Sequence, residues 1–266
     1  MNQQCRFGIK QTIFAIAAAA MAISAQAAVI SVTPGSTLWV NPPGENGSDG
    51  KGSSTISATM AHAGNGSLEL AGDRTRMVMG SLYTTPTSLG LLDDLSRLTF
   101  DWAIAGDSVS ALNKDYTPAL RVSVVDNGKR YELVWEGVYN GTYGKTERDT
   151  WYSAGIGDVF YRYDASAKDV TKAGTSQVNM TLAGWESSNY FTDAAYIIGF
   201  SVGAGSPAGA NYHAFADNVT IGMRNGSETI YNFEARGADV PEPGSLALLG
   251  LGLAAAAAAS RKRRAR

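Results

Sequence analysis

The sequence has 266 residues, of which 22 are Lys or Arg and 24 are Asp or Glu, so its formal net charge is −2. Residues 28–240 hold 15 of the basic and 23 of the acidic residues, which gives this segment a net charge of −8. Because nucleic-acid binding needs a basic surface to neutralise phosphates, this charge excludes DNA and RNA as partners of the segment. It favours solubility outside the cell and suits a cation such as Ca²⁺.

The first predicted element is a secretory signal helix. Arg6 and Lys10 precede an apolar run that ends in the small-x-small sequence Ala25-Gln26-Ala27. Signal peptidase accepts such small residues, and the run is too short to span the roughly 30 Å hydrocarbon core of a bilayer. We therefore expect residues 1–27 to be a signal peptide, cleaved by signal peptidase between Ala27 and Ala28, rather than an N-terminal core helix.

Residues 28–239 are predicted to form one all-β domain, because apolar side chains recur there with a period of two and no long helical stripe is present. The clearest alternation runs through Leu98, Phe100, Trp102 and Ile104. Each such strand is expected to have one buried face. Further strands are expected at residues 68–70, 76–79, 120–124, 131–136, 178–182, 196–202, 217–223 and 228–233.

Two Asn-Gly pairs predict tight hairpins between these strands. Asn127-Gly128 and Asn225-Gly226 both have the sequence that is typical of two-residue type I′ turns, which need positive φ at both positions. About ten strands in one domain favour a two-sheet β-sandwich, and we expect jelly-roll connections between its strands.

Two glutamates in one predicted strand are the best candidates for catalysis. Concanavalin-like retaining glycosidases carry a Glu-x-Asp-x-Glu pattern, whereas here Val134 stands between Glu132 and Glu136 where the aspartate belongs. A retaining mechanism needs carboxyl groups about 5–5.5 Å apart, but positions i and i+4 of a regular strand lie about 13 Å apart. We expect both glutamates on the solvated face of a strand; a secreted glycan-active hydrolase that uses them is the alternative.

Four aromatic residues in stretches rich in Gly, Ser and Asp are candidates for glycan binding, because sugars stack their C–H faces on Trp and Tyr rings. These residues are Trp151, Tyr152, Trp185 and Tyr190. The alternative is that they pack against the edge of the sandwich.

The histidines give no sign of a zinc site or of an enzyme. His62 and His213 are far apart in sequence, and no Cys, Asp or Glu follows either at metal-ligand spacing. Serine-hydrolase, phosphate-binding and metalloprotease motifs are also missing. We therefore expect a domain that is not an enzyme, with the two histidines in loops or at strand ends.

The segment His62–Leu70, together with Asp217-Asn218-Val219, is similar to jelly-roll carbohydrate-binding modules. In those modules an aspartate of the last strand commonly helps to hold a structural calcium ion. The resemblance implies that Asp217 is a calcium ligand here, and it leaves the other ligands open. Apart from this calcium, no cofactor is expected.

The last predicted element has three parts in a fixed order. Pro241-Glu242-Pro243 precedes an apolar run that extends to Ser260, and a basic cluster, Arg261–Arg266, follows. As a helix, residues 244–260 would be about 25 Å long, slightly short of the bilayer core. We expect a marginal transmembrane helix whose basic end stays in the cytoplasm, so that the domain faces away from the cytoplasm.

Residues 240–266 resemble the PEP-CTERM sorting signal, which consists of a Pro-Glu-Pro motif, an apolar helix and an Arg-rich cluster. The stretches 135–140, 217–222 and 231–234 also resemble a domain common in PEP-CTERM proteins. The resemblance implies cleavage near Pro241-Glu242-Pro243 by an exosortase, and a Gram-negative host that makes an exopolysaccharide matrix. A plain single-span anchor is the alternative.

The expected function follows from both ends of the chain. We expect a protein that is held briefly in the inner membrane and then released to the cell surface or extracellular matrix. There it would bind exopolysaccharide or serve as a structural module of a biofilm.

Overall fold

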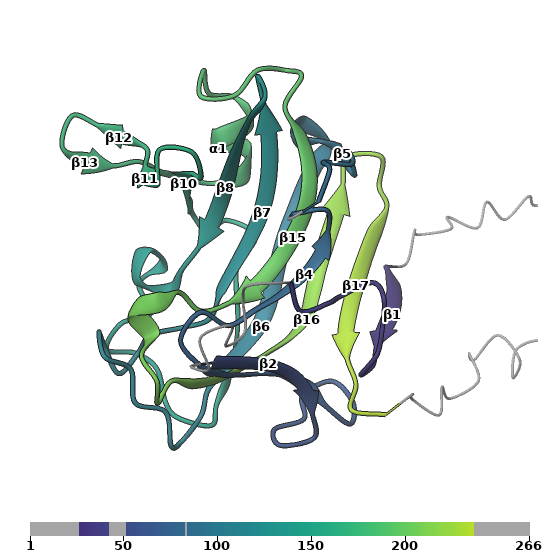
Figure 1. The fold of residues 1–266 in the computed structure, drawn as a ribbon, viewed down its shortest axis with the longest axis vertical. Helices are drawn as coiled ribbons and strands as arrows, with labels where there is room; N and C mark the ends of the chain where they lie inside the picture. The colour runs from purple at the N-terminus through teal and green to yellow at the C-terminus, as the bar shows by residue number, and fades with distance from the viewer. Residues whose placement is uncertain (1–26, 43–51, 83, 237–266) are drawn as a thin grey trace, which may run out of the picture.

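The computed structural model describes residues 27–42, 52–82 and 84–236 (Figure 1). The predicted signal helix before Ala27, the sorting motif and the predicted transmembrane helix lie outside these residues. Among the described residues, no helix is both long and apolar enough to span a membrane. The first strand begins at Ala28, the first residue after the predicted signal peptidase site.

The fold is almost entirely β, as the sequence predicts, and two main sheets are present (Figure 1). We call the seven-stranded sheet sheet A. Five of its strands lie in the spatial order β1 (Ala28–Val32), β17 (Glu228–Phe233), β16 (His213–Met223), β3 (Ser67–Gly72) and β2 (Gly52–Ser57). In addition, β6 (Leu95–Ile104) pairs with β16, and β9 (Trp151–Ser153) pairs with β6. All its pairs are antiparallel except β1 with β17, which is parallel.

The eight-stranded sheet, here called sheet B, has the order β11 (Asp169–Val170), β10 (Phe160–Asp164), β8 (Lys129–Trp135), β7 (Ala119–Asp126), β15 (Tyr196–Gly203) and β4 (Arg76–Gly80). Two short strands extend it, β14 (Asn179–Met180) beside β10 and β5 (Gly90–Leu91) beside β15. A separate hairpin consists of β12 (Lys172–Ala173) and β13 (Ser176–Gln177). The helical turns are η1 (Leu92–Asp94), η2 (Gly137–Asn140), α1 (Leu182–Glu186) and η3 (Ser206–Ala208).

One apolar core joins the two sheets. The predicted alternation of β6 is confirmed, since Leu98, Phe100, Trp102 and Ile104 are all buried in this core. The ring of Phe100 meets Trp135 of β8 edge to face, with 5.1 Å between the ring centroids. Burial of such large rings supplies most of the free energy that holds the sheets together.

The two Asn-Gly hairpins differ in their turns. Asn127 and Gly128 have φ angles of 49° and 72°, so the predicted type I′ turn between β7 and β8 is confirmed. The hairpin between β16 and β17 also forms, but its loop is one residue longer, because Met223 and Ser227 close it by a backbone hydrogen bond of 2.8 Å. In that longer loop only Gly226 has positive φ, so the predicted type I′ turn at Asn225-Gly226 is wrong.

The predicted strand at residues 178–182 is also replaced in part by a helix. Strand β14 covers only Asn179 and Met180, and α1 begins at Leu182. Thr181 caps this helix, since its side chain accepts a hydrogen bond from the backbone N–H of Gly184. Such an N-cap satisfies a donor that would otherwise be unpaired, and it favours a helical turn over continuation of the strand.

Candidate functional site

The loop between β2 and β3 is held against the end of sheet A by a buried carboxylate. Glu234, which follows β17, is 3% exposed and accepts a 2.5 Å hydrogen bond from the backbone N–H of Asn65. A Cβ atom at Gly64 would lie only 1.7 Å from Oε1 of Glu234. Residue 64 must therefore be glycine for the loop to approach this carboxylate so closely.

Asp217 of β16 ties the same loop to β17. Its side chain is fully buried, and Oδ1 accepts 2.8 Å hydrogen bonds from the backbone N–H groups of Asn218 and Phe233. Oδ2 receives a longer contact, 3.4 Å, from the N–H of Ala63. Burial raises the pKa of Asp217 to about 6, although these hydrogen bonds and the nearby His62 act in the opposite direction.

The oxygens around this loop fit the donor chemistry of calcium. Besides the carboxylates of Asp217 and Glu234, the side-chain oxygen of Asn232 is buried and has no hydrogen-bond partner within the described residues. Its Nδ2 donates to the carbonyl of Ala63 and to Glu234 Oε1 at 3.1 and 2.9 Å, so these groups lie together. Calcium prefers such carboxylate and amide oxygens. The residues described contain no group of three or more His, Cys, Asp and Glu side chains placed to hold a metal ion.

The loop places His62 on the outer face of sheet A. His62 Nε2 lies 2.9 Å from Oδ2 of Asp101, and its ring stacks on Trp151 with 4.3 Å between centroids and an interplanar angle of 22°. Asp101 also accepts hydrogen bonds from Ser153 Oγ at 2.5 Å and from Asn218 Nδ2 at 2.9 Å. These three donors, which come from different elements, hold the carboxylate in one orientation.

A cavity of about 410 Å³, lined by both polar and apolar residues, opens beside Asp101 on this face. Most of the side chains around it carry hydrogen-bonding groups; they include Thr99, Asp101, Ser153, Asn218, Thr220 and Asn232. Arg97, at one end of the cavity, is paired with Glu228 at 3.2 Å. The cavity can therefore offer acceptors, hydroxyls and amides to a polar ligand.

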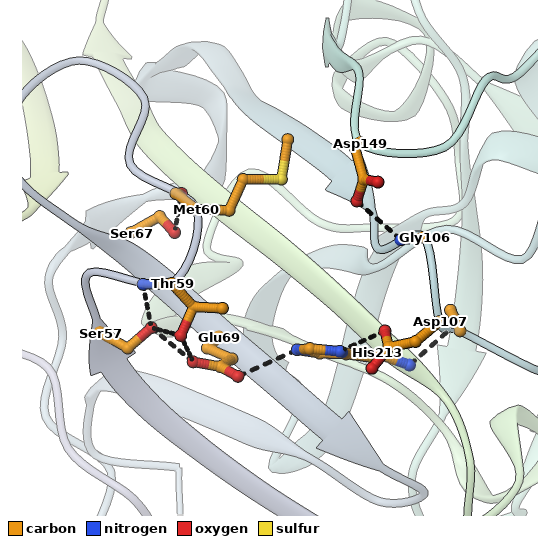
Figure 2. A network of polar contacts seen from close by, with 10 residues as sticks. Ser57, Thr59, Met60, Ser67, Glu69, Gly106, Asp107, Asp149 and His213 are labelled. Carbon is orange, nitrogen blue, oxygen red and sulfur yellow. Dashed lines mark hydrogen bonds and ion pairs between the residues drawn. The ribbon is translucent and has the colours of Figure 1, made fainter.

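His213 lies on the same face of sheet A, between two carboxylates (Figure 2). Its Nε2 is 2.9 Å from Glu69 and its Nδ1 is 2.7 Å from Asp107. Burial alone would raise the pKa of Glu69, but hydrogen bonds from Ser57, Thr59 and His213 outweigh it and lower this pKa below its usual range. A second cavity, of about 560 Å³, lies beside Asp107 and His213.

A small apolar cluster connects the two histidines. The ring centroids of His213 and Phe215 are 4.9 Å apart, and Phe215 packs with Ala103, Ala105, Met60 and Trp151. The sequence did not indicate that the two histidines share a face, because it is the pairing of β16 with both β3 and β6 that brings them there. We call the surface from His62 to His213 the histidine face.

The four predicted glycan-binding aromatics are not brought together. Trp151 lies on the histidine face, whereas Tyr152, the next residue of β9, stacks on the core residue Trp102. Trp185 is fully buried in α1 and donates its indole N–H to the carbonyl of Phe160 at 2.8 Å, so the prediction that its ring is open to sugars is wrong. Tyr190 packs edge to face against Trp185.

The prediction that Glu132 and Glu136 lie on the solvated face of a strand is wrong for Glu132, which belongs to β8. Its side chain is 10% exposed, and its carboxylate accepts two hydrogen bonds from Arg76, at 3.0 and 3.3 Å. The guanidinium of Arg121 lies 3.9 Å away. Burial would raise the pKa of Glu132, but the two arginines lower it. The cause is that β7 and most of β8 are buried on both faces.

Glu136 has different surroundings from those of Glu132. It lies just beyond β8, where burial raises its pKa despite the nearby charge of Arg121. Its Oε1 accepts a 3.0 Å hydrogen bond from the hydroxyl of Tyr161. The two glutamates are thus held by separate partners rather than by each other.

Comparison with known proteins identifies the C-terminal signal but not the domain. No curated protein and no solved structure matches the chain. A family model described as the PEP-CTERM protein-sorting motif matches residues 239–264, which include Pro241, Glu242 and Pro243. The chain therefore carries a PEP-CTERM protein-sorting motif, which implies export, a transient membrane anchor and processing by an exosortase.

Proposed function

We propose that residues 28–239 form a carbohydrate-binding module without enzymatic activity, and that it binds exopolysaccharide at the cell surface or in the extracellular matrix. The observation that carries the proposal is the cavity beside Asp101, with its hydrogen-bonding side chains, on a face that also contains Trp151. Sugar-binding sites combine a few fixed polar groups, which bond hydroxyls, with an aromatic ring against the C–H face. The sorting motif supports it, because exported proteins of this class meet the matrix polysaccharide.

Within the cavity, each group has a distinct role in the proposal. Asp101 accepts hydrogen bonds from sugar hydroxyls, and its orientation is fixed before binding by His62, Ser153 and Asn218. Asn218 can donate and accept at once, which suits a hydroxyl that does both. Because these side chains are already ordered, binding costs less conformational entropy.

We also propose a structural calcium ion at the loop that carries His62. Asp217 with Asn232 and Glu234 would hold it, and the ion would neutralise two buried carboxylates. The exported protein should then melt at a lower temperature in excess chelator, and added Ca²⁺ should restore the melting temperature. An unchanged melting curve would remove calcium from the account and leave the loop held by hydrogen bonds alone.

A glycan hydrolase that uses Glu132 and Glu136 is the alternative. One observation favours it, namely that the surroundings shift the two pKa values in opposite directions, as in many acid–base pairs. Against this alternative, both carboxylate oxygens of Glu132 accept hydrogen bonds from Arg76, so this carboxylate is not available as a nucleophile or a base. We therefore expect that the wild-type protein releases no reducing sugar from the exopolysaccharide, and that the Glu136→Gln variant gives the same result.

A binding experiment tests the proposal. Exported protein recovered from the culture medium should be retarded in affinity electrophoresis through gels that contain exopolysaccharide from the same culture. Asn218→Ala should weaken this retardation about tenfold, whereas Lys129→Ala, at an exposed hairpin of sheet B, should leave it unchanged. Equal mobility of all three proteins in gels with and without polysaccharide would contradict carbohydrate binding.

A further inference from the structure

A cluster of tyrosines lies on the outer face of sheet B, away from the apolar core. Strand β10 turns Phe160 into the core, so the next residue, Tyr161, points to the outer face of sheet B. Tyr139, on the turn η2 after β8, meets Tyr161 edge to face, with 5.4 Å between the ring centroids. Tyr139 is 39% exposed, whereas Tyr161 is mostly covered.

The turn that presents Tyr139 is fixed by the side chain of Asn140. Its amide donates to the carbonyls of Glu136 and Val159 at 3.1 and 3.0 Å, and its oxygen accepts the N–H of Val159 at 2.8 Å. Every hydrogen-bonding group of this buried amide is thus used to join η2 to the segment before β10. An exposed ring on such a rigid turn loses little entropy when it binds a ligand.

Polar groups of several elements surround the exposed ring. The hydroxyl of Tyr139 contacts Gln177 of β13 at 3.3 Å, and Tyr161 donates to Glu136 at 3.0 Å. Tyr143 follows the turn η2 in the chain and is half-buried; burial, and then the charge of Glu136, raise its pKa. An aromatic ring beside an amide and a carboxylate is again the composition of a sugar-binding site.

We propose that this tyrosine cluster, defined by Glu136, Tyr139, Tyr143, Tyr161 and Gln177, is a second binding site for pyranose residues, so that one domain cross-links two polysaccharide chains. The inference rests on the proposed function, because it takes the histidine face as the first site. The two sites are on the outer faces of different sheets, with the core between them. In Figure 1 the hairpin β12–β13, next to the tyrosine cluster, and the strands β1 and β17 project on opposite sides.

Two polysaccharide chains can therefore bind to one domain at the same time. Such cross-linking produces a polysaccharide network, which a domain with a single site cannot produce. A binder with one site coats a polysaccharide and leaves it dispersed, whereas a bivalent binder joins chains into a network. Tyr139→Ala should remove the second site and leave the first. Val138→Ala alters an exposed neighbour on the same turn that is outside the proposed site, so it serves as the matched control.

The test uses the full exported protein with two probes: exopolysaccharide from the same culture and oligosaccharide fragments made from it by partial acid hydrolysis. Calorimetry with the fragments should give two sites per wild-type chain, and one site for either Tyr139→Ala or Asn218→Ala. Sedimentation with the intact polymer should show a precipitated network for wild type and Val138→Ala. The precipitate should fall at least tenfold for Tyr139→Ala, although its binding to the polymer persists.

The outcomes separate the two proposals. One site in the wild type that Asn218→Ala removes and Tyr139→Ala does not affect would overturn cross-linking and keep the proposed function. One site that depends only on Tyr139 would overturn both cross-linking and the histidine face as a binding surface. No binding of either probe would contradict the proposed function itself. Unchanged thermal unfolding of each variant, followed by circular dichroism, shows that a loss of binding is not a loss of fold.

Discussion

His62 and Trp151 stack with their ring centroids 4.3 Å apart, and this contact joins the loop between β2 and β3 to the edge strand β9. Replacing Trp151 by Ala removes the ring on which His62 rests, which is the aromatic ring of the histidine face next to the cavity residue Ser153 of the same strand. Affinity for exopolysaccharide should fall about tenfold, as expected for loss of one stacked ring. Tyr152→Phe, on the same strand but facing Trp102, is the control and should bind as the wild type does.

The buried ion pair of β8 predicts a large effect on stability. Glu132→Gln removes the carboxylate that pairs with Arg76 and faces the buried guanidinium of Arg121, which should lower the free energy of unfolding by about 3 kcal/mol or more. Chemical denaturation at pH 7 measures this loss. Glu147→Gln, at an exposed position, should change the stability by less than about 0.5 kcal/mol. Equal stability of the two variants would show that the pair is not formed.

Asp217 predicts a dependence of stability on pH. Its pKa is about 6 in the folded protein against 3.8 ordinarily, so the folded state binds this proton more tightly than the unfolded state does. The stabilisation is therefore complete below about pH 4 and is lost as the pH rises to about 6, and it amounts to roughly 3 kcal/mol.

Asp217→Asn isolates this contribution, because the amide oxygen can still accept the N–H groups of Asn218 and Phe233. In excess chelator, the wild type should lose stability relative to the variant between pH 4 and pH 6, as measured by denaturant unfolding at each pH. A difference between the two proteins that stays constant across this range would contradict a raised pKa at Asp217.

The sorting motif predicts the ends of the mature protein. Mass spectrometry of protein recovered outside the cell should find Ala28 at the N-terminus and no peptide beyond Pro241-Glu242-Pro243. Two prolines keep this motif extended and out of the following helix, so a membrane protease can reach it. Extracellular protein that still contains residues 246–253 would instead favour a plain membrane anchor.

The sequence predicts the core of this fold well, because the alternation of apolar and polar residues along a strand can be read from neighbouring positions in the chain. Phe100 and Trp102 follow the period of two, and both are buried as expected. The prediction that each strand has one solvated face was wrong for Glu132, because its partners Arg76 and Arg121 come from β4 and β7 and no local pattern links them. Their position on paired strands is visible only once the register of sheet B is known.

The candidate site was harder to predict, since its parts come from distant segments. The Gly64 loop, Asp101 and Trp151 meet only because β6 pairs with both β16 and β9. In this region the sequence singled out Asp217, through the resemblance to carbohydrate-binding modules, and Trp151, as a candidate for glycan binding. Trp185 shows the opposite error, because a single capped turn of helix buries a ring that its Gly- and Ser-rich surroundings had suggested was exposed.

The central claim is that the histidine face binds the polysaccharide, and a nuclear magnetic resonance titration tests it most directly. The indole N–H of Trp151 is buried and has no hydrogen-bond partner within the described residues, so a shift of its resonance reports a change in how this ring packs on the histidine face. Isotopically labelled protein titrated with exopolysaccharide fragments should show saturable shifts of the Trp151 indole and of the Asn218 side-chain amide. If these resonances stay in place while the fragments are in large excess, the histidine face is not the binding surface.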